Sequence, residues 1–103
     1  MALTRQIEFK TVLQKRNRIQ VPRPIRWEFQ LETTQTLHVL VHFEGNWRSH
    51  QKFYTQMNKD GRIKIPQVAG NLLKAAVGGQ NIVGEVVEVE LSPAALEADE
   101  EDD

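Results

Sequence analysis

The chain has 103 residues, of which 40% are hydrophobic, enough for one small domain with a single core. It contains no cysteine, which excludes a disulfide framework and a thiolate metal site. The N-terminus carries no hydrophobic signal segment, and no apolar run approaches the ~20 residues that span a membrane. We therefore expect a cytoplasmic protein without a membrane partner.

Charge is distributed unevenly along the chain. Residues 1–27 hold seven Lys or Arg side chains against a single acid, whereas residues 94–103 hold six acids and no base. Without that C-terminal stretch, the net charge of −1 becomes about +5. We expect residues 94–103 to form a disordered acidic tail. This tail either solubilises the protein or competes with nucleic acid for a basic face.

The first half of the chain predicts strand, turn, strand, short helix and strand. Residues 8–13 and 18–21 alternate in polarity as strands do, and the residues between them suit a turn. Pro22 and Pro24 end the second strand, because proline cannot donate to a ladder, and both suit the first turn of a helix. Residues 36–43 give the clearest strand pattern. The side chains that this pattern directs inward are Leu37, Val39, Val41 and Phe43.

The second half repeats this plan. Residues 51–57 and 62–65 predict strands, and Asp60-Gly61 is a hairpin-type turn between them. Pro66 opens a helix that ends at Gly78-Gly79, where the chain enters the left-handed region. The apolar face expected for this helix consists of Val68, Leu72 and Ala76. The last strand is expected at residues 85–91, with Val87, Val89 and Leu91 inward and Glu88 and Glu90 outward.

The two halves contain similar segments, KRNRIQVP from Lys15 and KDGRIKIP from Lys59, which lie forty-four residues apart. Asn17 corresponds to Gly61, and these residue types best tolerate a positive φ angle. We infer an internal duplication of a ββαβ unit. One unit has too few strands to cover its hydrophobic face, so two units related by a pseudo-twofold axis are expected to close a mainly β, six-stranded cradle-loop barrel with two short helices. The predicted domain covers residues 1–93, with repeats at about 8–44 and 50–92.

The Gly-Arg turn, the alternating strand, the Ile-Pro step and the short helix resemble the motif of the AbrB/SpoVT family. GRIKIP matches this motif closely, and NRIQVP matches it nearly as well. Proteins of that family usually carry one motif per chain and dimerise into a swapped-hairpin barrel that binds DNA. Because this chain carries two motifs, it resembles the related single-chain proteins with a RIFT barrel, and a double-psi barrel is the topological neighbour.

The resemblance implies that DNA contacts come largely from arginines. The arginine after the turn glycine corresponds to Arg18 and Arg62, so both repeats keep it. An arginine pair beyond the motif proline corresponds to Arg26 and Trp27 in the first repeat. In the second repeat both charges are lost, and Gly70 stands at the place of Arg26. The resemblance therefore favours the first repeat as the DNA-binding half.

Six basic residues are the predicted nucleic-acid contacts, because such charges neutralise phosphates and release counterions. They are Lys15, Arg16, Arg18, Arg23, Arg26 and Arg62. The first three surround one turn, which is able to enter a groove. We predict an AbrB-like DNA-binding protein that regulates transcription, as a monomer or a homodimer. The alternative is a non-catalytic β-barrel module that binds another protein.

The remaining conspicuous residues favour structure over chemistry. Trp27 is expected in the core, and Trp47 is expected to pack over a barrel end, in the link between the repeats. His38 and His42 share a strand face but stand roughly 13 Å apart at strand rise, too far to bind one metal ion together. The sequence shows no glycine-rich phosphate loop and no Ser/His/Asp grouping, so we expect no cofactor and no enzymatic activity.

Overall fold

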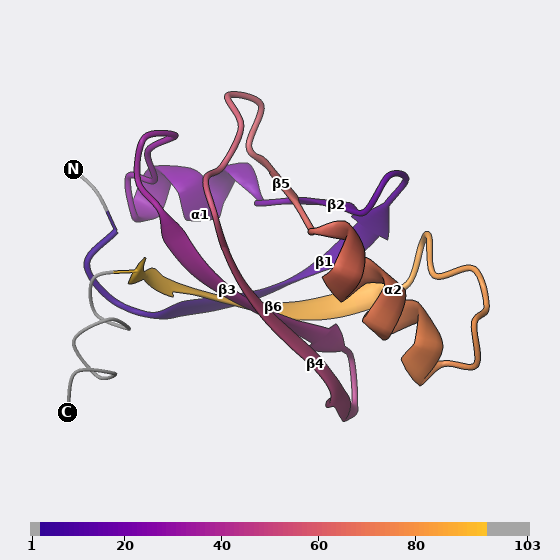
Figure 1. Cartoon of the computed structure of the whole chain (residues 1–103). Helices are drawn as coiled ribbons and strands as arrows, with labels where there is room; N and C mark the ends of the chain where they lie inside the picture. Colours follow the sequence, from indigo (N-terminus) through magenta and orange to yellow (C-terminus); the bar gives the residue numbers. More distant parts are fainter. Residues whose placement is uncertain (1–2, 95–103) are drawn as a thin grey trace, which may run out of the picture.

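The computed structural model describes residues 3–94. This part of the chain contains six strands and two helices (Figure 1). The elements are β1 (Ile7–Gln14), β2 (Arg18–Gln20), α1 (Arg23–Glu28), β3 (Leu37–Phe43), β4 (Asn46–Thr55), β5 (Arg62–Lys64), α2 (Gln67–Ala76) and β6 (Val86–Pro93). The strands form one sheet in the order β4-β3-β6-β1-β2-β5, and each ladder in it is antiparallel. The sheet curls into a half-barrel, which confirms the predicted fold class.

The pseudo-twofold axis passes between β2 and β5. Ile19 pairs directly with Ile63 across these strands, and both side chains are fully buried. On one side of this pair the amide of Val21 donates to the carbonyl of Gly61 (2.8 Å), and on the other the amide of Ile65 donates to the carbonyl of Asn17 (2.7 Å). Val21 and Ile65 occupy equivalent places in the two repeats, as do Gly61 and Asn17. The duplication predicted from the sequence is therefore present in the hydrogen bonding.

The same symmetry organises the large part of the sheet. Phe9 of β1 pairs with Val89 of β6, and its counterpart Phe53 of β4 pairs with Val39 of β3. β3 and β6 are thus equivalent strands, and they lie side by side in the sheet. The first strand of each repeat therefore pairs with the last strand of the other repeat. This exchange is needed because one repeat alone has too few strands to cover its own apolar face.

Positive φ angles shape both hairpin turns. Asn17 has φ 56° and Gly61 has φ 83°, which confirms the expectation for this matched pair. Arg16 also has a positive φ, 63°, which was not predicted. The first turn therefore holds two consecutive residues in the left-handed region, where a non-glycine residue is uncommon.

The inward residues of the last strand of each repeat are buried as predicted. The other face of β3 is buried too, although its pattern predicted an exposed face. His38 is 9% exposed, Leu40 is 6% exposed and His42 is 8% exposed. β3 lies between β4 and β6, and aromatic side chains of β4 cover its outer face, with ring-centroid distances of 5.0 Å from His38 to Tyr54 and 4.8 Å from His42 to Trp47.

The buried face of α2 differs from the prediction. Val68 is 72% exposed and Leu72 is 49% exposed, whereas the helix buries Ala69, Gly70 and Leu73. The large apolar residues indicated the wrong face because small residues make the close approach. A Cβ atom on Gly70 would lie 2.7 Å from the side-chain nitrogen of Asn17, so a larger residue there would have to displace the Asn17 side chain.

Both tryptophans lie on the surface, so the expectation that Trp27 is a core residue is wrong. Trp27 is 71% exposed, because α1 has no fully buried residue and packs on the core only through half-buried neighbours. Trp47 is 56% exposed and belongs to β4, not to a link that covers a barrel end. β4 begins five residues earlier than predicted, because the connection after β3 is a short turn with Gly45 at φ 75°.

No helix in residues 3–94 is long and apolar enough to cross a membrane. The predicted acidic tail lies outside the described residues, apart from Ala94.

Candidate nucleic-acid interface

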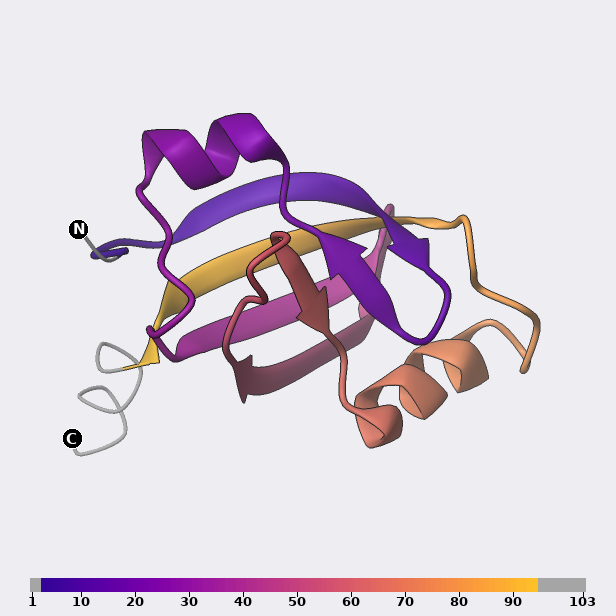
Figure 2. The same cartoon turned by 90° about the horizontal axis from the view of Figure 1, so that it is seen from above.

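The outward side chains of β2 and β5 surround the pseudo-twofold axis. Because Ile19 and Ile63 point into the barrel, their neighbours on both strands point outward. The register places Arg18 opposite Lys64 and Gln20 opposite Arg62. Cross-strand partners lie ~5 Å apart between Cβ atoms, so three cations and one amide share a small surface. Figure 2 looks onto β2 and β5, which lie above the large part of the sheet.

We use the name axis face for this surface, the turns that precede β2 and β5, and the adjacent Arg26. Its cations are Lys15, Arg16, Arg18, Arg26, Lys59, Arg62 and Lys64. The turns belong to it because Asn17 and Gly61 are tied by hydrogen bonds to the residues that follow the partner strands. Asp60 is the acid of these segments, and it pairs with Arg62, whose Nη1 lies 3.1 Å from Asp60 Oδ2.

Arg26 joins the first repeat to the turn of the second. A Cβ atom on Gly61 would lie 2.5 Å from Arg26 Cζ and 2.6 Å from its Nε and Nη1, so the guanidinium packs on the glycine backbone. The equivalent contact elsewhere in the barrel is that of Gly70 with Asn17. Each helix thus touches the turn of the other repeat, but only the first repeat places a charge there.

Three of the predicted contacts share an unusual feature. The Nε atoms of Arg18, Arg26 and Arg62 are buried and find no hydrogen-bond partner among residues 3–94. An arginine has five N–H donors, and a buried donor without an acceptor costs free energy. The Nε–H groups of these three arginines are therefore buried donors without an acceptor among the described residues.

The other predicted contacts lie at the edges of the axis face. Lys15 and Arg16 are exposed on the first turn. Arg23 begins α1, and its Cζ atom lies 5.7 Å from the centroid of the Trp27 ring, in a cation–π contact. The structure therefore brings Arg18, Arg26 and Arg62 together, whereas Arg23 lies at the start of α1 beside an exposed indole.

A second cluster of charged residues lies on the outer face of β1, β6 and β3, and it was not predicted as a site. These residues line a cavity of about 460 Å³, which we call the acidic groove. Its lining residues are Glu8, Phe9, Lys10, His42, Trp47, Glu88, Val89 and Glu90. Glu8 pairs across the strands with Glu90, and Lys10 pairs with Glu88. Sequence alternation directs these side chains outward but does not reveal the register that makes them neighbours.

The carboxyl groups of the acidic groove interact within the protein. Burial raises the pKa of Glu90, and a hydrogen bond with Glu8 and the negative charge of Glu8 raise it further, while His42 and Lys52 oppose them. Like charges directly opposite on neighbouring strands destabilise a sheet, and a shared proton removes one of them.

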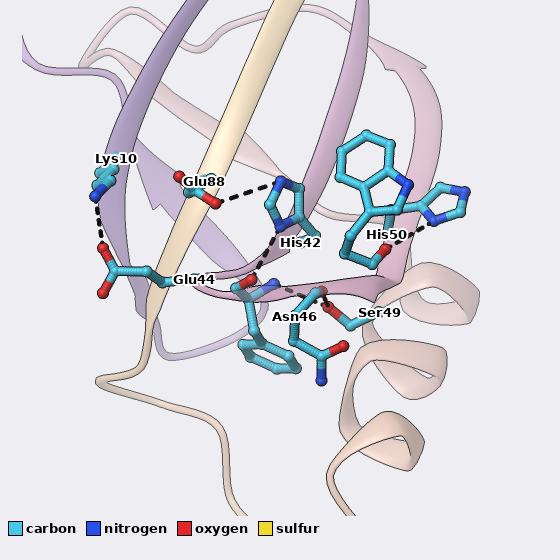
Figure 3. Close-up of polar contacts among 9 residues, drawn as sticks. Lys10, His42, Glu44, Asn46, Ser49, His50 and Glu88 are labelled. Atoms are coloured by element: carbon cyan, nitrogen blue, oxygen red, sulfur yellow. Dashed lines mark hydrogen bonds and ion pairs between the residues drawn. The ribbon is translucent and has the colours of Figure 1, made fainter.

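The remaining groups beside the acidic groove are also paired (Figure 3). His42 Nδ1 lies 2.9 Å from the carbonyl oxygen of Phe43, and its Nε2 lies 3.6 Å from Glu88 Oε2. Lys10 Nζ lies 2.7 Å from Glu44 Oε2, and this hydrogen bond is the main reason why the pKa of Lys10 is raised. Within the part of the chain that the structure describes, no three His, Cys, Asp or Glu residues are arranged to hold a metal ion.

The comparisons with known proteins establish the fold alone. No family model and no curated protein matches the chain. Among solved structures, it is similar to the solution structure of PHS018 from Pyrococcus horikoshii, with a TM-score of 0.69 and 20% sequence identity, over 90% of this chain and 94% of the other. The protein is thus a small, mainly β domain whose six antiparallel strands curl into a half-barrel. Its function has to be argued from its own surfaces.

Proposed function

We propose that the protein binds DNA through the axis face and acts as a transcriptional regulator. The observation that carries this proposal is the position of Arg18 and Arg62 on either side of the pseudo-twofold axis, within a surface of seven cations and one acid. Such a surface neutralises phosphates and releases counterions, which supplies affinity.

The symmetry of the axis face supports a duplex as the partner. Two-fold related proteins place equivalent side chains on the two strands of a duplex, whose backbone has a matching dyad. In this barrel one chain supplies both halves. Arginine, unlike lysine, also forms bidentate hydrogen bonds with phosphate and with the guanine edge. The resemblance to the AbrB/SpoVT motif, with its arginine after the turn retained as Arg18 and Arg62, supports the same partner.

A duplex-binding measurement at two salt concentrations tests the proposal. The double variant Arg18→Gln with Arg62→Gln is compared with Lys52→Gln with Lys74→Gln, which removes the same charge from β4 and α2. Because each lost phosphate contact reduces the salt slope by about 0.9, the first variant is expected to bind mixed genomic duplex fragments more weakly, with a slope lower by about 2. The control is expected to keep the parent's slope. Equal slopes in the two double variants would contradict the assignment of the axis face.

A protein-binding module is the second candidate, and the exposed apolar face of α2 favours it. Val68 and Leu72 lie one helical turn apart and are largely exposed. Absence of any salt-sensitive shift of duplex DNA by the unmodified chain would reject the first proposal and leave this one.

A further inference from the structure

The outer side of α1 presents an indole ring to solvent. Trp27 is 71% exposed, more than Trp47 or Tyr54, the other exposed aromatic side chains of residues 3–94. Ile25 and Phe29 are the residues of this segment that pack against the core. Because successive helical residues are about 100° apart, Trp27 projects from the opposite side of α1. This ring is therefore a large apolar surface that the fold does not use in its core.

A cation lies over one face of the Trp27 ring. Arg23 precedes Trp27 by one helical turn, is itself exposed, and places its Cζ atom 5.7 Å from the ring centroid. The guanidinium group covers one face of the ring, so a flat partner has the other face to stack on. Trp47 differs in this respect, because the His50 ring already stacks on it at a centroid distance of 5.2 Å and an interplanar angle of 16°. Of the two indoles, Trp27 is thus the one better placed to stack on an external ring.

The charges around Trp27 are complementary to a nucleotide. Around the helix, Arg23 and then Arg26 follow on one side of Trp27, and Glu28 lies on the other side. Arg26 packs on Gly61, so the cationic side of Trp27 borders the axis face. Figure 1 shows α1, β2 and β5 on the same side of the large part of the sheet. A nucleotide offers a flat π-face to an aromatic ring and a phosphate to a neighbouring cation, and proteins that bind single strands use this combination.

The second repeat does not carry this pair. Gln67 stands forty-four residues after Arg23, at the equivalent place of α2. Asn71 likewise stands at the place of Trp27. The two-fold symmetry that fits the axis face to a duplex therefore ends at α1, where one half alone has an aromatic ring. Inside a duplex each base is covered by its neighbours, so a base has to be unpaired and unstacked before it stacks on a protein ring.

We infer that Trp27 and Arg23 form a stacking platform for one unpaired base of a DNA strand whose phosphates lie on the axis face. The base stacks on the open face of the indole, and the Arg23 guanidinium adds a positive charge beside the adjoining phosphate. This platform rests on the proposed function, because the axis face supplies the phosphate contacts that bring the strand to α1. Every base has a π-face, so the platform distinguishes unpaired from paired DNA with little dependence on which base is bound.

The test compares three DNA duplexes of the same sequence. One is blunt, one carries a single-stranded thymidine extension, and one carries an extension of abasic nucleotides, which keeps the phosphates and lacks the bases. The whole chain is expected to bind the thymidine extension on the order of tenfold more tightly than the abasic extension, as one stacked base would give. Trp27→Ala is expected to lose this preference and to keep the fold, because the side chain is exposed. Trp47→Ala is the matched control and is expected to retain the preference.

Tryptophan fluorescence reports the contact directly. Trp27 and Trp47 are the two tryptophans of the chain, so the emission of the Trp47→Phe variant comes from Trp27 alone. The thymidine extension is expected to quench this emission, since a stacked base quenches an indole, whereas the abasic extension is expected to leave it unchanged. Equal affinities for the thymidine and abasic extensions, or a preference that Trp27→Ala retains, would overturn the inference.

The platform and the proposed function fail in different ways. A blunt duplex that binds, with neither a thymidine preference nor quenching of Trp27, rejects the platform and keeps the proposed function. A free thymidine strand that binds and quenches Trp27, while no blunt duplex binds, supports the platform and rejects duplex recognition. The absence of binding to all of these DNAs rejects both.

Discussion

The axis face and the acidic groove are built on the same curled sheet, yet they treat charge in different ways. In the groove, each of the pairs Glu8–Glu90, His42–Glu88 and Lys10–Glu44 brings its partners together within the protein. On the axis face, three arginine Nε atoms lack an acceptor among the described residues. The two cationic side chains of the groove, Lys10 and His42, lie beside acids, whereas on the axis face Asp60 pairs with Arg62 and leaves an excess of cations. The comparison therefore favours the axis face over the acidic groove as the place where an external anion binds.

The largest expected effect comes from removing the support beneath the axis face. Ile63→Ala is expected to lower the free energy of unfolding by about 2–5 kcal/mol, because it leaves a cavity where two fully buried isoleucines meet. Urea denaturation measures the change. Val68→Ala, on the exposed face of α2, is the control and is expected to stay within about 0.5 kcal/mol of the parent. Similar losses in the two variants would mean that the β2–β5 ladder does not hold the barrel together.

A smaller effect is expected at the turn that Arg26 touches. Gly61→Ala and Gly45→Ala both place a side chain at a positive φ, so each is expected to lose about 1–2 kcal/mol in a urea titration. Only Gly61→Ala also displaces the Arg26 guanidinium, since nothing lies within 4 Å of a Cβ on Gly45. We therefore expect weakened duplex binding in Gly61→Ala alone. An equal loss of duplex binding in Gly45→Ala would show that Arg26 is not a contact.

The smallest effect concerns the acidic groove and its pH dependence. The pKa of Glu90 is above its ordinary value of 4.5 in the folded protein, so this group favours folding below that value. Its contribution is lost as the pH rises through the raised pKa. Glu90→Gln is expected to abolish this loss and to stabilise the protein at pH 7 by roughly 0.2–1 kcal/mol, the range for a cross-strand pair.

Urea titrations at pH 4 and pH 7 measure the difference. Glu85→Gln, at an exposed position just before β6, is the matched control for the loss of one carboxylate. A Glu90→Gln variant that is less stable than the parent at pH 7 would show that the ionised carboxylate supports the groove.

Local patterns in the sequence located all six strands and both hairpin turns, although β4 begins earlier than predicted and the positive φ of Arg16 was not foreseen. Alternating residues located β3 and β6, and the match of Asn17 with Gly61 located the two positive φ angles. The same patterns did not identify which face of a short helix is buried. On α2 the answer depended on Gly70, whose missing side chain matters only because Asn17 lies against it.

The candidate site was only partly visible in the sequence. The resemblance selected Arg18, Arg26 and Arg62, and the structure brings these three to one surface. The acidic groove was missed because Glu8 and Glu90 are eighty-two residues apart and become neighbours only through the register of β1 and β6. Trp27 was assigned to the core because a large apolar residue on a helix usually packs inward, whereas α1 is too short to bury one.

The meeting of Ile19 with Ile63 has a consequence for how such a barrel changes over time. In a homodimer of single repeats, a residue on the axis would meet its own copy, and any substitution would act on both sides at once. Joined in one chain, the two positions are free to vary separately. Arg26 and Gly70 already differ at equivalent sites, so one half of the molecule keeps a cation where the other keeps a tight helix contact. Two repeats within one chain can thus carry different side chains at equivalent positions of the surface.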